Sequence, residues 1–146
     1  MYFADSIEGT VTSFDYDVSR GRLGPPTILI KIQVDDGVPD GLAVDSNGGL
    51  LVALWDGWSI RKYDKSGKLL SQLDVPVRHI TNCAFAGFDL LDLVITTAQP
   101  DSHLLGDQPL AGCVFQTSND VAGVQLLRLQ ANVPFEAWGS SHDCNR

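Results

Sequence analysis

The stretch VPDGLAVDSNGGLLVALWDGWSIRKYDKSGKLLSQLDVPV, residues 38–77, decides the fold of this chain. It contains four short apolar or alternating runs, and the turns between them each carry Gly, Asp or Asn. The runs are residues 42–44, 50–54, 59–63 and 69–75. Turn signals that recur about every 8 to 10 residues are typical of antiparallel strands, and no run here supports a long helix. The stretch therefore predicts one four-stranded antiparallel sheet.

The same pattern recurs on both sides of this stretch. The matching segments are residues 2–5, 10–15 and 28–32 upstream, and residues 81–85, 93–96 and 112–115 downstream. A repeat period of about 40 to 50 residues indicates a stack of similar units, as in the blades of a propeller. We therefore expect two to three consecutive blades, with the first strand missing from the upstream one and three strands visible in the downstream one.

On these motifs the chain resembles the senescence-marker protein, gluconolactonase and luciferin-regenerating enzyme family of regucalcin-like six-bladed propellers. The motifs stand in the family's order and spacing, and they match only the C-terminal half of a family propeller. They are YFADS (2–6), FDYD (14–17), GVPDGLAVD (37–45), VALW (52–55), RKYD (61–64), PV with TNCAF (76–77 and 81–85) and TTA (96–98). The sequence departs from the family at residues 56–58, where DGW replaces a glycine-rich hairpin.

The resemblance implies an all-β fold, namely a partial β-propeller of two to three four-stranded antiparallel blades. We assign residues 1–117 to this gluconolactonase-like region and leave residues 118–146 as a C-terminal tail without an assignment. Six such blades need roughly twice this length of chain. We therefore expect the chain to belong to a longer propeller, or to be completed by another chain.

Asp40 is the candidate catalytic and metal-binding residue. Taken alone, Asp40 followed by Gly41 is a common turn dipeptide. The resemblance implies more, because in the family the aspartate of this Pro-Asp-Gly is one of three protein ligands to a divalent metal on the channel axis and a candidate base toward the lactone or its attacking water. Carboxylate oxygens suit calcium or magnesium, and zinc tolerates them.

The resemblance thus implies a metal-dependent lactone hydrolase that acts on a small-molecule lactone. The family's other two metal ligands, a glutamate and an asparagine, have no counterpart in this sequence, and its substrate contacts also lie in the half that is not matched. Whether this chain alone is an enzyme is left open. The alternative is a non-catalytic, truncated propeller that acts as a binding or interaction module.

Alignment of the repeats adds Thr81 as a second candidate site residue. Thr81 occupies in the next blade the position that Asp40 occupies in its own blade. Its hydroxyl could line the channel, or its β-branched side chain could simply favour the start of a strand. Trp55 and Trp58 flank a hairpin, where they could shape a pocket rim or pack between blades.

Composition narrows the possible partners. The formal net charge is −8 and the ten Lys and Arg residues are scattered, which argues against nucleic acid, because that partner requires clustered cations. No apolar run approaches the length of a membrane helix and no export signal is visible, so we expect no membrane partner and a soluble, cytoplasmic protein. Unpaired blade edges predict possible self-association.

The remaining signals are weaker. Cys83 and Cys113 are expected in strands as buried thiols, and with Cys144 they form no disulfide framework or zinc site. Pro25 and Pro26 are expected in a loop outside the ladder. Residues 35–37 are expected as a solvated turn, residues 141–143 (Ser-His-Asp) as a coincidence, and His79 and His103 in loops without partners at metal-ligand spacing.

Overall fold

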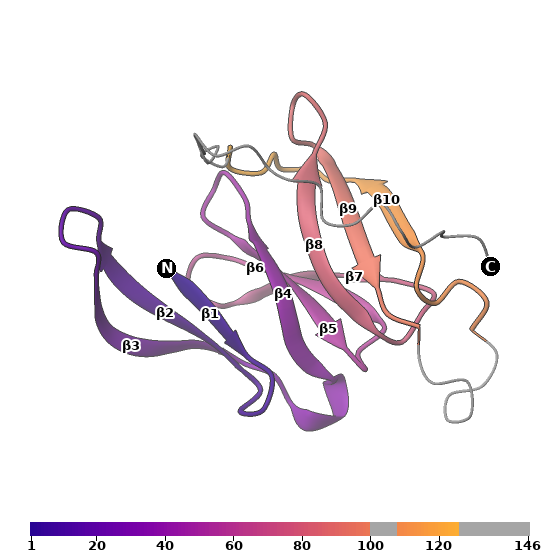
Figure 1. The fold of residues 1–146 in the computed structure, drawn as a ribbon, viewed down its shortest axis with the longest axis horizontal. Coiled ribbons are helices and arrows are strands. Elements are labelled where there is room, and N and C mark those ends of the chain that lie inside the picture. The colour runs from indigo at the N-terminus through magenta and orange to yellow at the C-terminus, as the bar shows by residue number, and fades with distance from the viewer. Residues whose placement is uncertain (100–107, 126–146) are drawn as a thin grey trace, which may run out of the picture.

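The structure is a computed structural model that describes residues 1–99 and 108–125, and it is built almost entirely from strands (Figure 1). Within these residues no helix has the length and apolar character needed to cross a membrane. The elements are β1 (Tyr2–Asp5), β2 (Thr10–Asp17), β3 (Arg22–Lys31), the 3-10 helix η1 (Val34–Asp36), β4 (Val38–Val44), β5 (Leu50–Trp55), β6 (Ser59–Tyr63), β7 (Leu69–Asp74), β8 (Ile80–Ala86), β9 (Asp92–Thr97) and β10 (Val114–Ser118).

The strands form three antiparallel meanders that follow one another along the chain (Figure 1). The N-terminal sheet has the order β1-β2-β3, the middle sheet β4-β5-β6-β7, and the C-terminal sheet β10-β9-β8. The prediction of an all-β, partial propeller is confirmed. Only the middle sheet has four strands among the described residues, because the N-terminal sheet lacks a counterpart of β4 and the C-terminal sheet lacks a counterpart of β7.

The hydrophobic core lies between successive sheets and divides at β5. Leu50, Val52 and Leu54 join the cluster shared with the N-terminal sheet, whereas Leu51 and Ala53 join the cluster shared with the C-terminal sheet. Successive strand residues point to opposite faces, so a strand with an uninterrupted apolar run can bury both. The five-residue run Leu-Leu-Val-Ala-Leu therefore makes β5 the central element of the stack.

The expectation that Pro25 and Pro26 form a loop is wrong. Both lie within β3, and Pro26 is paired with Phe14 of β2. Proline lacks the N–H that a central strand needs, but β3 is an edge strand of its sheet, where that donor is dispensable. A register shift between Phe14 and Tyr16 accommodates the irregularity.

The two described cysteines differ in their surroundings. Cys83 is buried against the carbonyl of Leu51, as predicted, and this burial raises the pKa of its thiol to about 12. The prediction of a buried Cys113 is wrong, because this residue precedes β10, an edge strand among the described residues, and is exposed. Cys144 lies outside the described residues.

Candidate functional site

The candidate site is built on two strand irregularities at equivalent places in neighbouring sheets. The pairing of β4 with β5 is interrupted between Pro39 and Leu42, and the pairing of β8 with β9 is interrupted between Ile80 and Asn82. Such bulges re-aim side chains and are frequent beside active sites. They bring Asp40 and Thr81 to the same position in successive first strands, as the repeat predicts.

Asp40 is a half-buried carboxylate that the described residues leave without a hydrogen bond or an ion pair. Partial burial raises the pKa of this carboxyl group, because desolvation disfavours its charged form. The strand segment before it is held in place, since the Ser6 hydroxyl, in the turn after β1, donates to the Pro39 carbonyl at 2.7 Å. The site thus combines a fixed backbone with a carboxylate that the fold does not use.

Beside Asp40, the first strands of two sheets approach each other closely. A Cβ atom placed on Gly41 would lie 2.6 Å from the Cα atom of Asn82 and 2.1 Å from its Oδ1 atom. Only glycine fits at this contact, because real Cβ atoms do not approach other atoms so closely. The motifs alone gave Asn82 no role, although the repeat aligns it with Gly41, which was the available signal.

The Thr81 hydroxyl is less available to a ligand than the Asp40 carboxylate. Its Oγ1 atom lies 2.7 Å from Oγ1 of Thr96 on β9, so the two hydroxyls form a hydrogen-bonded pair. The pair remains accessible to solvent at the start of the C-terminal sheet. A channel-lining role for Thr81 therefore stays a prediction, with its hydroxyl already bound to a neighbour.

A polar cluster braces the middle and C-terminal sheets at the same end of the strands. The rings of Trp55 and His79 stack with centroids 4.0 Å apart and planes at 8°. The Asp56 carboxylate accepts from Arg78 Nε at 2.8 Å and lies 2.8 Å from Nε2 of His79. These contacts favour the inter-blade packing interpretation of Trp55, while Trp58 is exposed.

The described residues do not form a metal centre by themselves. Within residues 1–99 and 108–125, no three His, Cys, Asp or Glu side chains are grouped so that they could hold a metal ion. Asp40 provides one carboxylate, whereas calcium takes six to eight oxygen ligands. His103 and residues 141–143 lie outside the described part of the chain.

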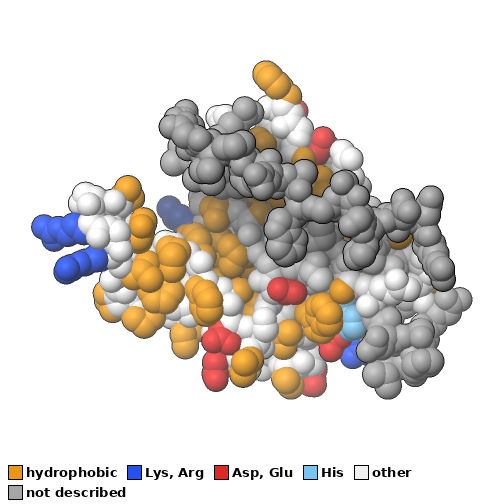
Figure 2. Space-filling model, viewed as in Figure 1, with side chains coloured by type: hydrophobic (Ala, Val, Ile, Leu, Met, Phe, Trp, Pro, Cys, Tyr) orange, Lys and Arg blue, Asp and Glu red, His pale blue; other side chains and the backbone are white. Residues whose placement is uncertain are grey.

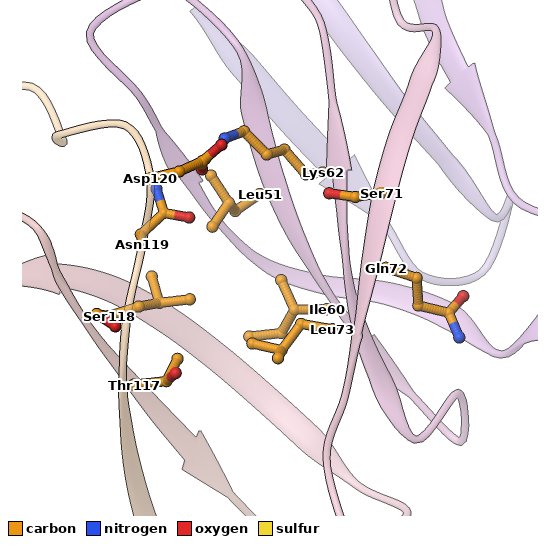
Figure 3. Close-up of a pocket in the computed structure, with 11 residues that line it drawn as sticks. Leu51, Ile60, Lys62, Ser71, Gln72, Leu73, Thr117, Ser118, Asn119 and Asp120 are labelled. Atoms are coloured by element: carbon orange, nitrogen blue, oxygen red, sulfur yellow. The ribbon is translucent and has the colours of Figure 1, made fainter.

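A cavity of about 220 Å³ lies away from Asp40, between β6 and β7 of the middle sheet and the β9–β10 side of the C-terminal sheet. Leu51, Ile60 and Leu73 form part of its wall, and Lys62 reaches across its rim to Asp120 (Figure 3). The Lys62 Nζ and Asp120 Oδ1 atoms are 2.7 Å apart. Among the described residues that line this cavity, Lys62 and Asp120 are the only charged ones, and they neutralise each other. The cavity therefore offers a less reactive environment than the Asp40 region.

The chain is similar in sequence to known proteins. A profile of the SMP-30/Gluconolactonase/LRE-like region matches residues 1–99. Regucalcin of Danio rerio is 38% identical over 121 residues, which are 81% of this chain and 41% of that protein. These matches confirm the resemblance predicted from the motifs.

Solved structures resemble the fold as well. The calcium-binding protein regucalcin of Agrobacterium tumefaciens C58 superposes with a TM-score of 0.77 at 28% identity, covering 88% of this chain and 45% of that one. A gluconolactonase of Xanthomonas campestris superposes with a TM-score of 0.51 at 29% identity, covering 60% and 27%. The chain spans less than half the length of each of these relatives.

Proposed function

We propose that this chain, which belongs to the SMP-30/Gluconolactonase/LRE-like family, contributes to a metal-dependent lactone hydrolase of the gluconolactonase type. The observation that carries the proposal is Asp40, a half-buried carboxylate at a strand bulge that has no partner among the described residues. Burying a carboxylate without a partner is unfavourable, and such groups concentrate at functional sites.

The proposed reaction is hydrolysis of a cyclic ester. The oxygen of a water molecule bonds to the lactone carbonyl carbon while Asp40 accepts a proton from that water. The bond between the carbonyl carbon and the ring oxygen then breaks, and the ring oxygen takes up the proton, which yields a hydroxy acid. A raised pKa brings the Asp40 carboxyl nearer to the operating pH and so suits it to accept and return a proton.

We also propose Asp40 as one oxygen ligand of a divalent cation, namely calcium, zinc or magnesium. The other ligands would come from groups outside the described residues, because the described donor set is too small to hold such an ion. We therefore assign no reaction step to the ion, and for this chain we assign only the Asp40 carboxylate to its binding.

A lactone assay with a pH indicator tests the proposal. Purified chain is mixed with gluconolactone and a divalent cation, with and without EDTA, and Asp40→Ala is compared with Asp35→Ala, which removes an exposed aspartate of η1. The same measurement is made on a longer polypeptide containing this chain, where we expect turnover that EDTA and Asp40→Ala abolish and that Asp35→Ala retains. Comparison with the 146-residue chain establishes whether groups beyond these residues are needed.

Two results would contradict parts of the proposal. If that longer polypeptide binds the metal but turns over no lactone of any ring size, the hydrolase function is wrong. Full activity of Asp40→Ala would remove Asp40 from the reaction while leaving the family assignment untouched.

A second candidate function is an interaction module, and an apolar face of the N-terminal sheet favours it. Phe3, Thr12 and Ile28 are register partners across β1, β2 and β3, and Phe3 and Ile28 are 54% and 66% exposed. Figure 2 shows hydrophobic side chains gathered over this sheet. In the rest of the stack such sheet faces pack against the next sheet. We therefore propose that this face drives self-association.

Sedimentation at micromolar concentration tests this second candidate. We expect the wild-type chain to self-associate and Ile28→Lys to sediment as a smaller species, because a charge on an apolar face opposes its burial. A wild-type chain that is a cooperatively unfolding monomer would contradict the proposal.

A further inference from the structure

Asn82 carries an unassigned donor beside Gly41, the residue that follows Asp40 in β4. Its side chain contacts Gly41, the residue that follows Asp40, at the closest approach between β4 and β8. Both strands are bulged at this point, so the contact joins two irregular segments. Asn82 is nonetheless exposed, which leaves its amide accessible from solvent.

The orientation of the Asn82 amide follows from its hydrogen bond. Its Oδ1 atom accepts from the backbone N–H of Cys83 at 2.8 Å, so the acceptor side of the amide is used within the protein. An asparagine amide also has an NH2 group with two donors. No described residue accepts a hydrogen bond from Nδ2 of Asn82, and this group is available to a ligand.

An unused carboxylate and an unused amide donor in neighbouring strands match the chemistry of hydroxyl groups. A hydroxyl both donates and accepts, so a carboxylate and an amide NH2 can hold adjacent hydroxyls of one molecule. We propose that Asn82 is a substrate-binding residue whose Nδ2 donates to a ring hydroxyl of a polyhydroxylated lactone held at Asp40. This inference rests on the proposed function and assigns to Asn82 a part in recognising the ring hydroxyls of the lactone.

Kinetics with two substrates test this assignment. Gluconolactone carries ring hydroxyls, whereas δ-valerolactone has the same six-membered ester ring without them. Asn82→Ala should lower kcat/KM for gluconolactone by about 5- to 10-fold, the value of one net hydrogen bond, and leave δ-valerolactone within about twofold. Asn47→Ala, in the turn beyond the opposite end of β4, is the matched control and should change neither value.

Equal losses on both substrates would mean that Asn82 acts only through the structure, and unchanged kinetics would mean that it does not contact the substrate. Either result overturns the inference. Substitution by Asp provides the conservative comparison, since Asn82→Asp keeps the acceptor for the Cys83 N–H but removes the donors. Asn82→Asp should lower kcat/KM for gluconolactone as much as Asn82→Ala does, while it preserves the fold.

A binding measurement keeps this inference separate from the proposed activity. In a 15N-edited NMR spectrum, the side-chain NH2 signal of Asn82 is identified by its absence in Asn82→Ala. Adding D-gluconate should shift this signal, and adding 5-hydroxyvalerate, which lacks the neighbouring hydroxyls, should not. If the chain hydrolyses no lactone but the signal shifts with D-gluconate, only the hydrolase function is wrong. A signal that does not respond overturns the Asn82 proposal whatever the turnover.

Discussion

Two aspartates mark the two ends of β4 and are used in opposite ways. Asp45 follows the last residue of the strand and is 2% exposed. One of its carboxylate oxygens, Oδ1, accepts from the backbone N–H groups of Asn47 and Gly49, at 2.9 and 2.7 Å. Asp40, near the start of the same strand, is partly buried and receives no hydrogen bond from the described residues.

The comparison distinguishes two kinds of carboxylate. Asp45 has a structural role, whereas Asp40 is left without a hydrogen-bond partner among the described residues. The two N–H donors compensate Asp45 for its loss of water, and together they close the turn between β4 and β5. Asp40 loses part of its hydration without any such compensation. This difference between the two ends of one strand supports the proposal that Asp40 binds a ligand.

The largest effect on stability should come from Asp45. Asp45→Ala removes two charge-assisted hydrogen bonds to backbone N–H groups that are then left unsatisfied, so we expect the free energy of unfolding to fall by about 3 kcal/mol. Asp40→Ala should cause no comparable loss. Urea unfolding followed by tryptophan fluorescence measures both. Similar losses in the two variants would abolish the distinction between the two aspartates.

A smaller loss is expected at the contact beside Asp40. Gly41→Ala places a methyl group against the side chain and the Cα atom of Asn82, so β4 and β8 must move apart. We expect a loss of about 1–3 kcal/mol, typical of overpacking at a tight contact. Asn82→Ala in the same chain should restore only part of it, because the Asn82 Cα atom is itself 2.6 Å from the added carbon. Full restoration would mean that the backbones are not in contact.

The smallest effect concerns the pH dependence of stability. The pKa of Asp40 is raised above its ordinary value of 3.8, so the folded state favours the protonated form. Its ionisation therefore lowers stability as pH rises through the unfolded and then the folded pKa. Asp40→Asn, which cannot ionise, should be more stable than wild type at neutral pH, and the difference should disappear below 3.8. Urea unfolding across this range measures it, and a variant less stable at neutral pH would reverse the sign.

The sequence by itself determined the repeating architecture of this protein. The apolar run of β5 and the regular turn signals specify strands through local chemistry, because alternation and turn residues act over a few positions. The repeat offset likewise predicted that Asp40 and Thr81 would take equivalent places in successive first strands, and both lie at bulges there.

Only the tertiary structure decided which side chains meet. Pro25 and Pro26 enter a strand because β3 is an edge, and Cys113 is exposed just before β10, an edge strand among the described residues. Asn82 is located beside Gly41, the residue after Asp40, by the approach of β4 and β8, which are far apart in sequence. One physical reason applies to the two prolines, to Cys113 and to Asn82. Edges, burial and inter-sheet contacts depend on how whole sheets stack, whereas strand propensity depends on neighbours along the chain.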